Sequence, residues 1–146
     1  MASSQTGHLR ILVIIGSLDL GGTERHLCQI LPKLQDNGIK ISIATIHDRG
    51  QLASEIERLG IPVLDPGLPR WLKRNRVLKI LATLLWLATL IAKQRPDIVH
   101  TFLPAAYILG GLCSTLLRVP GRIMSRRSLN RYQQRHPFLA RVEYWL

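Results

Sequence analysis

The chain has 146 residues, of which 47% are hydrophobic and 5% aromatic, and its formal net charge is +11. This length is enough for one domain with its own core, and the composition excludes an intrinsically disordered chain. The positive charge suits an anionic partner such as nucleic acid, acidic lipid or a phosphate-rich ligand, and a solvated surface is the alternative interpretation.

Apolar, β-branched runs alternate along the chain with segments whose apolar residues recur at helical spacing. The predicted strands are residues 9–15, 39–46, 61–64, 97–102 and 122–125. The predicted helices are residues 23–36, 51–59, 75–94, 104–117 and a last helix that starts near Pro137. This alternation predicts an α/β fold, a Rossmann-like parallel sheet with helices on both faces.

Ligands of such sheets bind beyond the carboxyl ends of the strands. The three loops that this rule selects follow Ile15, His100 and Ser125. The first of them ends in Gly21 and Gly22 at the start of a predicted helix. Adjacent glycines let a ligand approach the backbone closely, and the helix N-terminus offers free N–H groups to a phosphate or a sugar hydroxyl. The alternative is that the two glycines only permit a tight turn.

This loop is neither a dinucleotide fingerprint nor a P-loop, because Ser17 is followed by Leu18 and no Gly-Lys-Ser/Thr ending occurs. The GGTER stretch at residues 21–25 instead resembles the GG-x-E-R signature of family 4 (group 1) glycosyltransferases. Further stretches are similar to that family in order and spacing. They are LPKLQDNG at residues 31–38, the L…E…L…GIPV pattern within residues 52–63, RPDIVH at residues 95–100 and SRRS at residues 125–128.

The resemblance, which spans about residues 9–132, implies the GT-B fold, in which two Rossmann-like domains face each other across a cleft. It implies a nucleotide-diphosphate sugar as co-substrate, no metal or other cofactor, a retaining reaction, and a glycan or lipid-linked acceptor. Substrate-binding roles are expected for Gly21, Gly22, Glu24, His100, Arg126 and Arg127. A hydrogen bond to backbone is the alternative role of the histidine.

No catalytic residue is assigned. Several relatives carry a histidine after the fifth strand, where this chain has Arg126 and Arg127, and arginine cannot act as a general base at neutral pH. The paired glutamates of the family's second domain, at E-x7-E spacing, do not occur in this sequence. We therefore expect residues 1–8 to be a disordered start and residues 9–146 to be an N-terminal, acceptor-side domain, truncated before the donor-binding domain and inactive without one in cis or in trans.

The predicted helix at residues 75–94 permits two interpretations. Its uncharged run, residues 80–92, is shorter than the roughly 20 residues that cross a bilayer, which favours a buried Rossmann helix. Trp71, Trp86 and the cations between Arg70 and Lys79 instead suit a helix that lies in an anionic membrane surface. The second functional hypothesis is accordingly a non-catalytic basic domain that docks on such a membrane or on a partner subunit.

Cys28 and Cys113 fall in apolar helical stretches and no CxxC motif occurs, so neither a disulfide framework nor a zinc site is expected. The apolar run at residues 11–15 is too short for the core of a secretory signal. We expect a cytoplasmic protein, peripheral on the inner face of the membrane if the second hypothesis holds. No nucleic-acid partner is expected, because few aromatic residues are available for base stacking.

Overall fold

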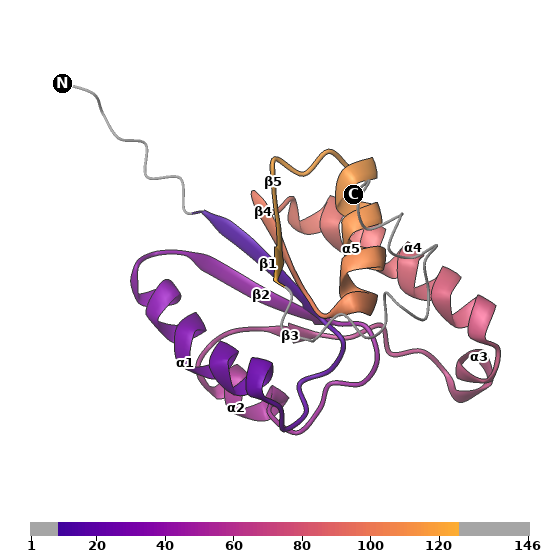
Figure 1. The fold of residues 1–146 in the computed structure, drawn as a ribbon, viewed down its shortest axis with the longest axis horizontal. Helices are drawn as coiled ribbons and strands as arrows, with labels where there is room; N and C mark the ends of the chain where they lie inside the picture. The colour runs from indigo at the N-terminus through magenta and orange to yellow at the C-terminus, as the bar shows by residue number, and fades with distance from the viewer. Residues whose placement is uncertain (1–8, 126–146) are drawn as a thin grey trace.

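A computed structural model of the chain describes residues 9–125, apart from the side chain of Lys73. Five strands form one parallel sheet in the order β3-β2-β1-β4-β5 (Figure 1). They are β1 (Arg10–Ile15), β2 (Lys40–Thr45), β3 (Val63–Leu64), β4 (Ile98–Phe102) and β5 (Gly121–Ser125). The predicted α/β, Rossmann-like fold is confirmed. The predicted disorder of residues 1–8 and the predicted helix near Pro137 lie outside the described residues.

Five helices connect the strands, and four of them were predicted. They are α1 (Gly22–Asp36), α2 (Ala53–Arg58), α3 (Arg70–Arg74), α4 (Arg76–Gln94) and α5 (Pro104–Leu116). The sequence analysis missed α3, which is too short to show a helical period. Asn75 separates α3 from α4 and caps the longer helix, because its Oδ1 accepts hydrogen bonds from the N–H groups of Val77 and Leu78 at 3.0 and 3.3 Å.

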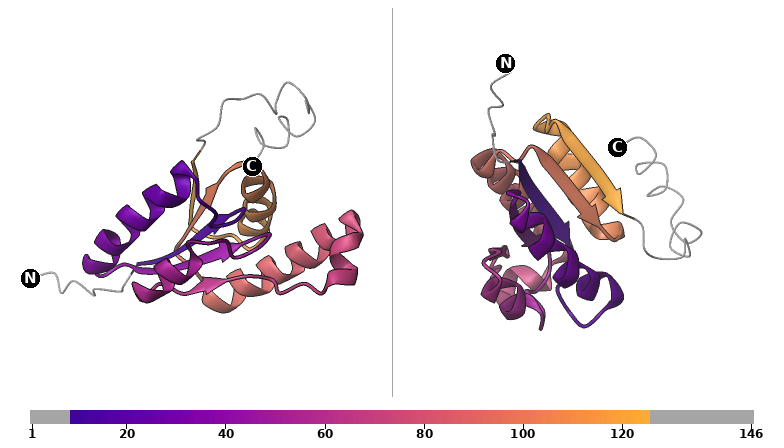
Figure 2. Two further views of the ribbon diagram at one scale, coloured as in Figure 1. Left: turned by 90° about the horizontal axis from the view of Figure 1, so that it is seen from below. Right: turned by 90° about the vertical axis from the view of Figure 1, so that its left-hand side faces the viewer.

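The uninterrupted apolar run of β1 is explained by burial on both faces of the sheet. Val13 and Ile15 pack with side chains of α1 and α2, including Leu27. Leu12 and Ile14 face the other way and pack with side chains of α4 and α5, which Figure 2 shows on the opposite side of the sheet from α1. Successive side chains of a strand point to opposite faces, so a central parallel strand covered on both sides needs apolar residues throughout.

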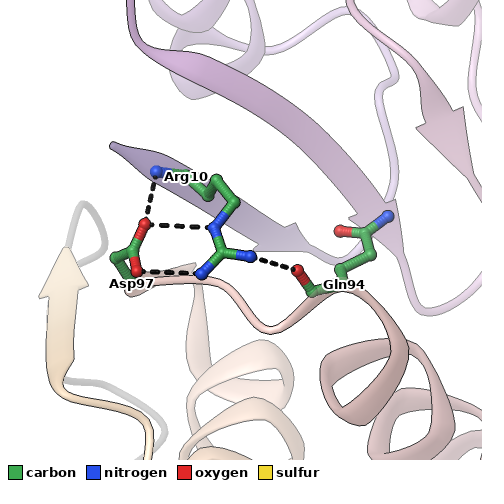
Figure 3. Close-up of polar contacts among 3 residues, drawn as sticks. All are labelled: Arg10, Gln94 and Asp97. Carbon is green, nitrogen blue, oxygen red and sulfur yellow. Dashed lines mark hydrogen bonds and ion pairs between the residues drawn. The ribbon is translucent and has the colours of Figure 1, made fainter. Parts of the chain in front are cut away.

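A polar network fastens the amino edge of the sheet (Figure 3). Arg10 donates from Nε and a terminal nitrogen to the two carboxylate oxygens of Asp97, at 3.2 and 3.1 Å, and from its backbone N–H at 2.8 Å. The other terminal nitrogen donates to the carbonyl of Gln94 at 3.4 Å. The hydrogen bonds from Arg10 lower the pKa of Asp97, so the carboxylate stays charged at neutral pH. This network joins β1 to the turn between α4 and β4.

Candidate functional site

The glycine loop, residues 16–22, joins β1 to α1 at the carboxyl edge of the sheet, and it is anchored by Leu18. The Leu18 side chain is fully buried in the core between the sheet and the helices α1 and α2. Its backbone N–H donates to the carbonyl of Arg49 at 3.2 Å, and its carbonyl accepts from the N–H of Leu52 at 2.8 Å. The loop is therefore fixed to the connection between β2 and α2 rather than hanging free in solvent.

Gly50 makes that anchoring feasible, although the sequence analysis did not single it out. It has a φ of +78°, which favours glycine, and a Cβ built on it would overlap the backbone of Leu18 and Asp19. The Asp48-Arg49-Gly50 stretch does carry a turn signal in the sequence. That signal cannot reveal that the turn presses against a loop more than 25 residues earlier in the chain.

Gly21 and Glu24 form a coupled pair at the start of α1. Gly21 is the N-cap residue and has ordinary extended backbone angles, but a Cβ on it would overlap the Glu24 carboxylate. Glu24 is only 8% exposed, and its carboxylate makes no hydrogen bond or ion pair with a side chain of the described range 9–125. The carboxylate thus lies folded back over the glycine loop, where a ligand hydroxyl could donate to it.

Gly22 differs from Gly21, because a Cβ built on it meets nothing within 4 Å. Its φ is not in the left-handed region either, so the fold of the described residues does not require glycine at this position. No side chain caps the N-terminus of α1. The N-terminus of this 15-residue helix carries a partial positive charge, and its exposed first residue, Gly22, has no side chain to cover the backbone.

His100 lies within β4 rather than beyond its end. Its Nε2 is 2.7 Å from the hydroxyl oxygen of Ser125 at the end of β5, and its ring stacks at 4.2 Å on Phe102, which is closer to the carboxyl edge. The predicted alternative of a backbone partner is therefore not what the structure shows. Burial lowers the pKa of His100, so the imidazole is neutral at physiological pH.

The turn between β4 and α5 carries the strongest backbone outlier at this edge. Leu103 has φ 71° and ψ 156°, a conformation that is almost restricted to glycine and costs about 1–3 kcal/mol. It precedes Pro104, the first residue of α5, and prolines ordinarily push the preceding residue to negative φ. The packing of β4 and α5 therefore holds this turn in place, and no sequence signal predicts it.

β1 and β4 are adjacent parallel strands, and His100 pairs with Val13, two residues before the end of β1, whereas Gly21, Gly22 and Glu24 lie beyond that end. Arg126 and Arg127 follow β5 and lie outside the described residues, so their predicted roles are not tested. Within residues 9–125 no three His, Cys, Asp or Glu side chains are grouped so that they could hold a metal ion.

The sequence model of Glycosyltransferase Family 4 matches residues 20–146, which is most of the chain. The chain belongs to Glycosyltransferase Family 4. The resemblance drawn from its motifs is thereby confirmed. No curated protein matches the chain.

Solved structures place the family 4 chain in the GT-B fold. It is similar to a glycosyltransferase from Rickettsia africae, with a TM-score of 0.62, 17% identity, 92% of this chain covered and 35% of the other. It is also similar to MurG from Acinetobacter baumannii, with a TM-score of 0.62 and 18% identity. That match covers 91% of this chain and 39% of MurG. A third similar structure is the UDP-GlcNAc 2-epimerase of Methanocaldococcus jannaschii, with a TM-score of 0.59 and 15% identity. That match covers 88% of this chain and 34% of the epimerase. This chain thus spans little more than a third of each, and a fold shared with an epimerase does not by itself define an activity.

The motifs of this family 4 chain fall at two different places in the fold. GGTER, residues 21–25, starts α1 at the carboxyl edge, beside the open space above Gly22. RPDIVH, residues 95–100, begins at the amino edge, where Asp97 binds Arg10. Its last residue, His100, lies within β4 and is bonded to Ser125. Motifs of one family can therefore lie at opposite edges of the sheet.

Proposed function

We propose that this chain supplies the acceptor-side domain of a nucleotide-sugar-dependent glycosyltransferase, and that the glycine loop faces the diphosphate of the donor. The observation that carries the proposal is the open space above Gly22 next to the buried, unpartnered Glu24. At Gly22 the anchored backbone is covered by no side chain, so an anion can approach the start of the helix without first displacing one.

In this proposal the reaction transfers a sugar from a nucleotide diphosphate to a hydroxyl of a glycan or lipid-linked acceptor. The N–H groups at the start of α1 would stabilise the departing diphosphate, and the Glu24 carboxylate would accept a hydrogen bond from a sugar hydroxyl. No residue of this chain is assigned as a general base, because neutral His100 is already paired with Ser125. Binding of the nucleotide falls to a second Rossmann-like domain, in cis or in trans.

A transfer assay tests this division of labour. The 146-residue chain is assayed with a panel of nucleotide sugars, first alone and then with a separately expressed donor-binding domain of the family. We expect no transfer by the chain alone, because the reacting atoms must be held within about 3–3.5 Å of each other and one wall of a cleft cannot do that. Robust turnover by the chain alone would contradict the proposal, since the donor site would then lie within it.

A second candidate function is docking on an anionic membrane, and it rests on the outer surface of α3 and α4. Trp71, Val77 and Leu85 are 70%, 65% and 69% exposed, and Leu78 and Leu81 are exposed beside them. The sequence between Arg70 and Gln94 contains no Asp or Glu. An apolar surface flanked only by cations is complementary to acidic lipid headgroups.

The helix α4 is, by length and composition, the one helix among the described residues that could cross a membrane. We place it along the membrane surface instead, because Thr83, Leu87 and Ile91 are buried against the rest of the domain. This orientation keeps the sheet in the cytoplasm and the carboxyl edge near the lipid. A protein held in this way would be cytoplasmic and peripheral.

Vesicle co-sedimentation separates this candidate from a merely basic surface. We expect binding to anionic vesicles that weakens in high salt, and a Trp71→Ser/Leu85→Ser variant that binds several-fold less. A Lys33→Gln change, on the exposed side of α1, is the matched control and should bind like the wild type. Equal and negligible binding to neutral and anionic vesicles would exclude the docking function.

A further inference from the structure

The N-terminal half of α4 extends past the sheet, and Figure 2 shows this half projecting together with α3. Leu87 and Ile91, in the second half of the helix, pack with Leu12 and Ile14 of β1. In the first half, Thr83 is the first fully buried residue, and Val77 and Ile80 remain exposed. The inner side of this overhanging half has no strand beneath it.

A cavity of about 530 Å³ lies between the overhanging half of α4 and the start of α5. Its walls are mainly apolar and come from three elements: Ile46 after β2, Ile80 on α4, and Ile108 with Leu109 on α5. This volume is within the range of about 300–1,000 Å³ that small-molecule sites occupy. The strained Leu103 turn sets the position of the α5 wall, because α5 begins directly after it.

The same cavity has a cationic rim. Arg76 and Lys79 lie three residues apart on one side of α4, and His47 approaches from the end of β2. His47 and Lys79 line the same cavity, and burial and the charge of Lys79 lower the pKa of His47, against the opposing charge of Asp48. No acidic side chain of the described residues lines the cavity, and α4 and α5 both begin here with the positive ends of their dipoles.

The cavity is also connected to the glycine loop. The backbone N–H of His47 donates to the carbonyl of Gly16 at 3.0 Å, and a Cβ on Gly16 would lie 3.8 Å from the His47 ring. A ligand held at the cationic rim would therefore lie beside the loop that we assign to the donor diphosphate. On its other side the cavity reaches Ile80, which is also part of the exposed apolar surface of α4.

We propose that this groove binds a single-chain amphiphile, with a phosphate or diphosphate group against Arg76 and Lys79 and the apolar chain between α4 and α5. The inference rests on the proposed function and sharpens it, since it makes the acceptor a sugar carried on a phosphate-linked lipid. The apolar walls fit a hydrocarbon chain and exclude a free glycan, whose hydroxyl groups would lose their hydrogen bonds there. The exposed surface of α4 gives the chain a route from the membrane into the groove.

Binding of farnesyl diphosphate to the 146-residue chain, measured by calorimetry, tests the groove. We expect inorganic pyrophosphate and farnesol each to bind at least about tenfold more weakly, because each offers only half of the contacts. An Arg76→Gln/Lys79→Gln variant should bind farnesyl diphosphate more weakly by a similar factor, because its contacts with the diphosphate are removed. Ala105→Trp fills the groove from an exposed position on α5. It should weaken binding by a similar factor, because the hydrocarbon chain of the ligand no longer fits. Lys33→Gln removes an exposed positive charge on α1, away from the groove, and should bind like the wild type.

Circular dichroism establishes that each variant is folded, and the rim variant still tests the groove if Ala105→Trp does not fold. Equal affinity for pyrophosphate and farnesyl diphosphate would overturn the proposal, as would a loss of affinity in the Lys33→Gln control that matches the rim variant. If the protein transfers sugar to a soluble glycan but does not bind farnesyl diphosphate, the proposed amphiphile site is contradicted and the proposed function is not. Selective binding without transfer after addition of a donor-binding domain would support the groove and contradict the proposed function.

Discussion

At the amino edge of the sheet, Arg10, Gln94 and Asp97 bond to one another, whereas at the carboxyl edge Glu24 is nearly buried with no partner among the described residues. The first group joins β1 to the start of β4. The second lies over an anchored loop that ends in open space at Gly22. The two edges contain motifs of the same family that differ in how far their polar groups are bonded within the described residues.

This contrast separates structural residues from candidate ligand residues by a physical criterion. A polar group whose hydrogen bonds are made within the chain contributes to the fold. A polar group or backbone left uncovered at a rigid position is available to a substrate, and its substitution should change activity more than stability. The glycines give the sharpest test, because Gly22, Gly50 and Gly67 differ in what surrounds them.

The largest expected effect is on transfer, at Gly22. Gly22→Val in the chain, assayed with a donor-binding domain, should reduce the transfer rate by about 100-fold, because a side chain there would displace a diphosphate by an ångström or more. The urea unfolding midpoint should stay close to that of the wild type, since a Cβ at this position meets nothing. The transfer rate of Gly22→Ala should lie between those of the wild type and Gly22→Val. Wild-type turnover by a folded Gly22→Val variant would refute the assignment of the glycine loop.

The next effect is on stability, at Gly50. Gly50→Ala should lower the free energy of unfolding by at least about 3 kcal/mol, because left-handed backbone strain is added to an overlap with the Leu18 backbone. Gly67 also has positive φ but has nothing near its Cβ, so Gly67→Ala should cost only the strain, about 1–2 kcal/mol. Denaturant unfolding measures both. Equal losses in the two variants would show that Gly50 does not brace the glycine loop.

A smaller effect concerns the pH dependence of stability at His100. Its folded-state pKa is lowered by burial, so the unfolded chain binds the proton more readily. Stability should therefore decrease as the pH falls below the unfolded value of about 6.5, down to the folded-state pKa. His100→Gln should flatten the curve of unfolding free energy measured between neutral and mildly acidic pH. An unchanged slope in His100→Gln would assign the effect to His47, whose pKa is also lowered.

The smallest effect is expected at the amino edge. Asp97→Asn should lower the unfolding midpoint slightly at neutral pH, because the ion pair with Arg10 is solvent-exposed. The folded-state pKa of Asp97 is lowered, so its contribution is present above the ordinary carboxyl pKa and disappears as the pH falls through the folded value. Transfer activity should not change. A large loss of transfer with unchanged stability would place Asp97 in the site and break the contrast between the two edges.

The sequence by itself determined the elements of this domain and its family. Apolar runs and alternation predicted each strand to within two residues of its observed bounds. The alternation of strands with helices predicted the parallel sheet. The helix α3 escaped prediction because five residues between Pro69 and Asn75 show no period.

Only the tertiary structure decided which residues face open space. Adjacent Gly21 and Gly22 are equivalent in the sequence, yet one faces the Glu24 carboxylate and the other faces nothing. The helix α4 has apolar residues on more than one side, so its spacing could not reveal that Leu87 is buried while Leu85 is exposed, or that its first half overhangs a cavity. The apolar pattern of a sequence reflects only the hydrophobicity of each residue. The exposure of a residue depends on which distant elements pack against it, and only the tertiary structure shows that.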